Sequence, residues 1–186
     1  MSAVLKSAVT REFLSGNEAV ARGALDAGVE IAAAYPGTPS TEIVETLATF
    51  PGVYAEWSTN EKVALEVALG ASMTGRRAIT AMKHVGLNVA SDSLMTLGQV
   101  GAKAGLVIAV SDDVGFSSSQ NEQDSRYWGR FVRLPVLEPS DASEAYAMTR
   151  AAFELSERFE VPVLLRLTTR VSHVKRMARI DAHEAP

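Results

Sequence analysis

Short, solidly apolar runs alternate with longer helical stretches along the chain, and this pattern constrains the fold more than any other feature. Parallel strands covered by helices on both faces are apolar throughout, whereas a strand with one face in water alternates apolar and polar residues. The expected strands are Val29–Tyr35, Val53–Trp57, Ala78–Met82, Leu106–Val110, Arg133–Leu137 and Val161–Leu165. Their alternation with helices predicts a three-layer α/β fold, with a mostly parallel six-stranded sheet between two helical layers.

Helix boundaries agree with this interpretation. Ser15 and Glu18 have the spacing of a capping box, and Gly28 ends the same helix. Thr38-Pro39 is interpreted as an N-cap followed by proline at the first helical position. Ser140-Asp141 opens the last long helix, whose buried face is expected to carry small residues.

The chain has 186 residues, a size at which about 70% of the unfolded surface can be buried in one core. Residues 1–173 are therefore expected to form one domain. From Val174 to Pro186 the apolar periodicity is lost, which predicts a loose tail or the start of a linker.

Composition excludes several classes of function. The formal net charge is −4 and the basic residues are scattered, which argues against nucleic-acid binding. The sequence has no cysteine, so this chain can hold no disulfide, zinc–thiolate site or iron–sulfur cluster. No apolar run is long enough for a signal peptide or a membrane span, so a cytoplasmic location without membrane contact is expected. The three histidines are far apart in the sequence, and no metal site is expected.

Five polar loops follow predicted strands. In parallel sheets ligands bind at the carboxyl ends of the strands, where the loops lead into helices. We therefore expect Tyr35, Glu61, His84 and Ser118 to lie along one edge of the sheet. The five loops are Tyr35–Ser40, Ser58–Glu61, Lys83–Asn88, Asp112–Asn121 and Thr168–Ser172.

The loop sequences carry a resemblance to a known family. The segments are Tyr35–Glu42, Asn60–Lys62, Met82–Asn88, Ser118–Arg126 and Leu137–Asp141. Taken together and in this order, they resemble the N-terminal domain of the large (alpha) subunit of indolepyruvate:ferredoxin oxidoreductases. These enzymes belong to the thiamine-diphosphate-dependent 2-oxoacid:ferredoxin oxidoreductases. The similarity extends from about Phe13 to about His173.

The resemblance implies the pyrimidine-binding domain of a thiamine diphosphate enzyme. In such enzymes a glutamate of this domain hydrogen-bonds N1′ of the cofactor's aminopyrimidine and promotes loss of the proton from the thiazolium carbon. The glutamate at the matching position is Glu61. The implied reaction is oxidative decarboxylation of aryl pyruvates such as indolepyruvate to acyl-coenzyme A, with electrons passed to ferredoxin.

Other site residues are expected from the same loops. Pro36, Gly37 and Thr38 join Glu61 as candidates for cofactor binding, and His84 is a second catalytic candidate. The candidates for substrate binding are Lys83, His84, Asn88, Ser119, Gln120 and Asn121.

Each assignment has a structural alternative. Ser58 and Glu61 also have capping-box spacing, in which case Glu61 would only stabilise its helix. His84 could instead be hydrogen-bonded to the backbone, and Thr38 could only cap a helix. Arg126 and Arg170 are candidates to bind a carboxylate, and Trp57 and Trp128 are expected to be packing or interface residues.

The sequence departs from the resembled family in two respects. It contains no Gly-Asp-Gly motif, which in the family holds the diphosphate through Mg²⁺, and it has no cysteines for clusters. A diphosphate-binding domain, a second subunit of the oxidoreductase and ferredoxin are therefore expected as partners, and iron–sulfur clusters are expected only in other segments or subunits. The isolated chain is expected to be inactive and homodimeric, pairing through Asn60–Ala71 or Leu87–Gly101. The alternatives are the pyrimidine-domain subunit of a split, sulfopyruvate-type decarboxylase and a non-catalytic dimerising module.

Overall fold

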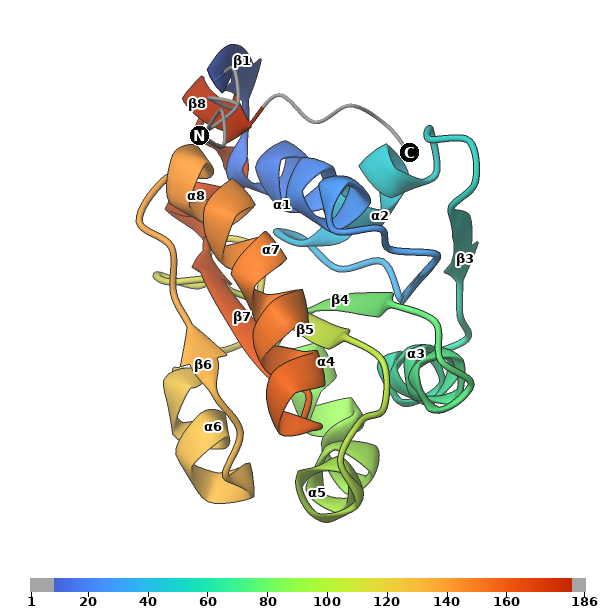
Figure 1. Ribbon diagram of the computed structural model, residues 1–186. Coiled ribbons are helices and arrows are strands. Elements are labelled where there is room, and N and C mark those ends of the chain that lie inside the picture. Colours follow the sequence, from blue (N-terminus) through green and yellow to red (C-terminus); the bar gives the residue numbers. More distant parts are fainter. Residues whose placement is uncertain (1–8, 182–186) are drawn as a thin grey trace, which may run out of the picture.

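The central feature of the computed structural model, which describes residues 9–181, is a six-stranded sheet in the order β3-β2-β4-β5-β7-β6 (Figure 1). All neighbouring strands pair in parallel. The strands are β2 (Ile31–Ala34), β3 (Tyr54–Trp57), β4 (Ala78–Lys83), β5 (Leu106–Asp112), β6 (Val136–Leu137) and β7 (Val163–Thr168). Each expected strand is present with its ends shifted by up to three residues, and the predicted fold class is confirmed.

Helices cover both faces of the sheet and build two apolar clusters. On one face lie α1 (Gly16–Asp26), α2 (Thr41–Leu47) and α7 (Ala142–Phe159). On the other lie α3 (Glu61–Met73), α4 (His84–Val89), α5 (Ser91–Val100) and α6 (Arg126–Val132). In β5, Val107 faces the first cluster and Ile108 the second, so the strand is apolar throughout because both faces are covered. Among residues 9–181, no helix has both the length and the hydropathy needed to cross a membrane.

Two of the three predicted helix starts are confirmed. The Ser15 hydroxyl accepts from the Glu18 amide at 3.2 Å, and the Glu18 carboxylate accepts from the Ser15 amide at 2.7 Å. Asp141 caps α7. The start at Thr38-Pro39 is wrong, because the Ser40 hydroxyl donates to the Gly37 carbonyl at 2.8 Å and forms a turn that delays the helix to Thr41.

A separate two-stranded ribbon was not predicted. β1 (Val9–Leu14) pairs antiparallel with β8 (Arg176–Asp181), with Val9 opposite Asp181 and Leu14 opposite Arg176. The expected loose tail is therefore wrong over Arg176–Asp181. Ala178 and Ile180 are fully buried in the first cluster, and this alternating burial holds β8 in place. The short helix α8 (Thr169–His173) precedes β8. The rest of the expected tail, residues 182–186, and residues 1–8 lie outside the described residues.

The carboxyl ends of the parallel strands place the predicted loops at one edge. Tyr35 follows β2, Glu61 opens the helix after β3, His84 follows β4 and Ser118 lies in the loop after β5. Since β2, β3, β4 and β5 run in the same direction, the expected common edge is confirmed.

Candidate functional site

Glu61 is the first residue of α3, and the residue that caps this helix is its neighbour. The Asn60 side-chain oxygen accepts from the Val63 amide at 3.0 Å. The Ser58 hydroxyl donates to the Glu56 carboxylate at 3.0 Å and takes no part in the cap. The capping-box alternative for Glu61 is therefore wrong, and the Glu61 carboxylate is not occupied with its own helix.

The Glu61 side chain lies against the backbone of α4 and is 8% exposed. A Cβ atom at Gly86 would fall 2.6 Å from Glu61 Oε1 and 2.7 Å from its Cγ, so only glycine permits this approach. Within residues 9–181, no hydrogen bond reaches the Glu61 carboxylate. Among the described residues, the buried side-chain oxygens without a partner belong to Asn17 and Thr80 and not to Glu61. The Glu61 carboxylate oxygens therefore still reach the surface, where a ligand can donate to them.

His84 is completely buried and links two strand ends. Its Nδ1 accepts from the Asp113 amide at 3.3 Å, which leaves the proton on Nε2 to be donated to the Asn121 carbonyl at 3.1 Å. Both ring nitrogens are thus engaged by backbone groups. This geometry favours the alternative in which His84 is hydrogen-bonded to the backbone, where it holds the loop after β5, over the catalytic role we expected.

Lys83 connects the loops after β2 and β5. Its Nζ donates to the Ser118 carbonyl at 3.0 Å, and a Cβ atom at Gly37 would meet its side chain at 3.3 Å. Pro36 and Thr38, on either side of Gly37, are exposed. Lys83 therefore brings the three candidate residues for cofactor binding next to the end of β4.

The remaining candidates for substrate binding differ in their exposure and in whether their polar groups already have hydrogen-bond partners. Ser119 donates from its hydroxyl to the Asp113 carboxylate at 2.8 Å, so that hydroxyl already has a partner. Asn88, Gln120 and Asn121 are exposed. The Asn121 backbone is held by His84, while its side-chain oxygen accepts from Gln123 at 3.0 Å.

Sequence reasoning missed a buried ion pair at this edge. Asp112, at the end of β5, is fully buried and accepts from Arg166 Nε at 2.8 Å. The Asp112 carboxylate also accepts from the amide and hydroxyl of Ser125, while Arg166 extends to Glu138. The available signal was an arginine directly after the apolar run Val161–Leu165, because a charge beside a buried strand requires a partner.

Asp113 holds the first half of the loop between β5 and α6. Its carboxylate accepts from the Ser118 amide and the Ser119 hydroxyl, both at 2.8 Å, and from the Thr169 hydroxyl at 3.0 Å. Burial by itself raises the pKa of the Asp113 carboxyl, but the hydrogen bonds from Ser118, Ser119 and Thr169 outweigh it and lower the pKa to about 2.

We expect this low pKa to make part of the stability acid-sensitive. Because the pKa of Asp113 is about 2 in the folded chain against an ordinary 3.8, its contribution is complete above pH 4 and is lost as the pH falls towards 2. The stability difference between the parent and Asp113→Asn should therefore narrow over this range. Urea unfolding at several pH values measures it, and a difference that stays constant from pH 6 to pH 2.5 would contradict the assignment.

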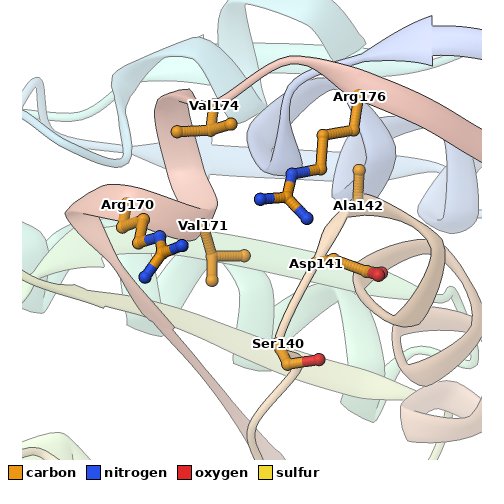
Figure 2. Close-up of a pocket in the computed structure, with 7 residues that line it drawn as sticks. All are labelled: Ser140, Asp141, Ala142, Arg170, Val171, Val174 and Arg176. Atoms are coloured by element: carbon orange, nitrogen blue, oxygen red, sulfur yellow. The ribbon is translucent and has the colours of Figure 1, made fainter.

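Neither arginine candidate lies next to Glu61. Arg126 pairs with Asp124 at 2.6 Å. Arg170 lines a separate cavity of about 200 Å³ together with Ser140, Asp141 and Arg176 (Figure 2). This cavity lies beyond β7, on the side of the sheet away from β3.

The two tryptophans differ. Trp128 packs against the second cluster and meets Phe131 edge to face at 6.0 Å between ring centroids, which confirms a packing role. Trp57 is 45% exposed. In the described part of the chain, no group of three or more histidine or acidic side chains is arranged to hold a metal ion.

Comparison with known proteins gives a consistent family. Residues 22–185 match the family described as pyruvate flavodoxin/ferredoxin oxidoreductase, thiamine diphosphate-binding. The chain is 56% identical over 168 residues to indolepyruvate oxidoreductase subunit IorA of Thermococcus kodakarensis, covering 89% of this chain and 26% of that protein. It is 30% identical over 174 residues to 2-oxoglutarate synthase subunit KorA of Archaeoglobus fulgidus, covering 88% of this chain and 50% of that protein.

The fold also matches a solved structure, a 2-oxoglutarate:ferredoxin oxidoreductase from Magnetococcus marinus with 2-oxoglutarate, coenzyme A and succinyl-CoA bound. The TM-score is 0.80 at 23% identity, over 94% of this chain and 32% of that chain. The chain thus spans about a quarter of the length of the IorA relatives it matches.

Proposed function

Since the chain belongs to the pyruvate flavodoxin/ferredoxin oxidoreductase, thiamine diphosphate-binding family, we propose that Glu61 binds the aminopyrimidine ring of thiamine diphosphate. The observation that supports this most directly is the largely buried Glu61 residue, whose carboxylate lies against Gly86, has no donor within residues 9–181 and still reaches the surface. Such a carboxylate fits a ring nitrogen that shares a proton, because a charge-assisted hydrogen bond is strong in a dry site.

The residues of the loops around Glu61 are assigned roles in binding the cofactor and the substrate according to their positions. Pro36, Gly37 and Thr38 lie beside Lys83 and would bound the ring, while Lys83 and Asn88 with Ser119, Gln120 and Asn121 would face the substrate. His84 holds the loop after β5 through both ring nitrogens and acts as a positioning residue. When bound, the cofactor supplies the electron sink for loss of carbon dioxide from a 2-oxo acid.

For the whole protein we propose oxidative decarboxylation of aryl pyruvates such as indolepyruvate to acyl-coenzyme A, with electrons passed to ferredoxin. The relatives that are 52–56% identical support this, since they are indolepyruvate oxidoreductase subunits. A diphosphate-binding domain would hold Mg²⁺, and other segments or a second subunit would carry the iron–sulfur clusters. We place the protein in the cytoplasm.

The test compares the isolated chain with the enzyme assembled from the longer polypeptide and its second subunit. The assembled enzyme should reduce ferredoxin in a reaction that requires an aryl pyruvate and coenzyme A. The isolated chain should bind thiamine diphosphate only at millimolar concentrations or above, because one ring contact supplies about 4 kcal/mol or less. Micromolar binding by the isolated chain would contradict the two-domain site, and decarboxylation without ferredoxin reduction would favour the split decarboxylase.

We also propose a homodimer that pairs through α3 and α5. Four large apolar side chains on these helices are exposed: Val63 at 36%, Met73 at 46%, Met95 at 38% and Val100 at 61%. Light scattering of the isolated chain at tens of micromolar should give the mass of a dimer, and the mass of a monomer would overturn this part of the proposal.

A further inference from the structure

The loop from residue 113 to residue 125 is held at both ends yet exposes two large apolar side chains. Asp113 fixes its first half through Ser118 and Ser119, and Asp112 fixes its last residue, Ser125. Between these anchors, Val114 is 51% exposed and Phe116 is 55% exposed. Single exposed apolar residues are common, so the exposure of Phe116 gains meaning only together with its backbone conformation.

Phe116 has a backbone φ of +37°, directly after Gly115 at +79°. This left-handed region is unfavourable for a bulky side chain and easy for glycine. Among residues 9–181 two other non-glycine residues have positive φ, Arg133 and Glu160, and both lie at helix C-termini, where this conformation is common. Phe116 ends no helix. Its amide donates to the Asp113 carbonyl at 2.8 Å and closes a turn, a position that does not require an aromatic side chain.

The loop that carries Phe116 is tied to the strand end beside Glu61. The Asp113 amide donates to His84 Nδ1 at 3.3 Å, and the Ser118 carbonyl accepts from Lys83 Nζ at 3.0 Å. Phe116 lies between these two tied residues in the sequence. Gly86, which contacts the Glu61 carboxylate, is two residues beyond His84. The tip of the loop is therefore held at the edge where Glu61 lies.

We infer that Phe116, with Val114, contacts the side chain of the 2-oxo acid and sets the preference for an aryl group. The inference rests on the proposed function, and it assigns the two ends of the substrate to different groups. Lys83 offers a cation for the carboxylate, while Phe116 offers a ring that packs against an aromatic ring edge to face or offset. The backbone of Phe116 has a positive φ and the residue is 55% exposed, so the ring is available for such a contact and is not packed in the core.

The experiment measures kcat/KM of the assembled enzyme for indolepyruvate and for pyruvate. In Phe116→Ala the ratio of the two values should fall about tenfold or more, mainly through indolepyruvate, since pyruvate has no ring to lose contact with. Phe116→Gly should lose the same preference while raising the melting temperature of the isolated chain, because glycine relieves the strained φ. Tyr127→Ala is the matched control: Tyr127 is 75% exposed on the adjacent α6, and its loss should leave the ratio unchanged.

Failure of the inference and failure of the proposed function give different results. A parent enzyme that converts no aryl pyruvate overturns the proposed function itself. A parent with aryl preference that Phe116→Ala leaves intact overturns only the inference. Equal losses for both substrates, or loss of assembly, would show that Phe116 packs against another domain, and would also overturn it.

Discussion

In the assembled enzyme, Glu61→Gln should lower activity about a hundredfold or more while the fold is retained. The amide has nearly the same shape as the carboxylate, so the contact with Gly86 and the cap by Asn60 should be unaffected. What would be lost is the carboxylate that we propose shares a proton with the ring nitrogen of the cofactor. Exchange of the thiazolium C2 proton of the bound cofactor, followed by NMR, measures this step directly.

The stability of Glu61→Gln separates the two possible roles of the side chain. A purely structural acid at a helix N-terminus is worth about 0.3–1 kcal/mol through the helix dipole. We expect a change in unfolding free energy no larger than that, because within residues 9–181 the Glu61 carboxylate has no hydrogen bond that the amide would lose, and its oxygens still reach the surface. Glu45→Gln, at an exposed position on α2, is the matched control and should leave exchange unchanged. An undiminished exchange rate in Glu61→Gln would remove the catalytic role.

The largest expected loss of stability comes from the buried pair between β5 and β7. Arg166→Met leaves the Asp112 carboxylate fully buried, with Ser125 as its remaining donor, and should lower the unfolding free energy by about 3–5 kcal/mol. Arg76→Met is the matched control, because Arg76 and Glu30 form an exposed pair, 57% and 45% accessible, that should be worth about 1 kcal/mol or less.

Urea unfolding of the chain compares these two variants. Adding Asp112→Asn to Arg166→Met should recover part of the loss, since the double variant no longer buries an unpaired charge. Equal effects of Arg166→Met and Arg76→Met would show that Asp112 is solvated or neutral without Arg166. That outcome would show that the Asp112–Arg166 pair is not what anchors the end of the loop at Ser125.

The layers of the fold were predictable because both faces of the sheet are covered. A strand such as β5 is then apolar at every position, and it stands out in the sequence. The β1–β8 ribbon escaped prediction because only alternate residues of β8 are buried and its partner lies about 170 positions away. The order of the strands could not be predicted either, because no local sequence pattern indicates that β7 lies between β5 and β6.

At the site, the positions of the loops could be predicted from the sequence, but the packing contacts and hydrogen-bond partners of their side chains could not. Glu61 was predicted from the family resemblance of the loops taken together. Its contact with Gly86, in contrast, depends on how α3 and α4 pack. His84 was predicted as a catalytic and substrate-binding residue, with backbone hydrogen bonding as the alternative, and two backbone partners from the loop after β5 occupy its ring. Asp112 and Arg166 meet only because the register of β5 and β7 brings them within reach. Each of these facts is set by tertiary structure.

The antiparallel ribbon has a mechanical consequence. Residues 9 and 181 are opposite each other at its open end, while the ribbon joins the helical body at Leu14 and Arg176. A force that separates residues 9 and 181 pulls along the inter-strand hydrogen bonds, which lie perpendicular to the strands. The bonds then break one after another, starting at Val9 and Asp181, and Ile180 and Ala178 leave the first cluster as they do so. The ribbon and its contacts with the first cluster therefore yield before the parallel strands, whose carboxyl ends carry Glu61, are loaded.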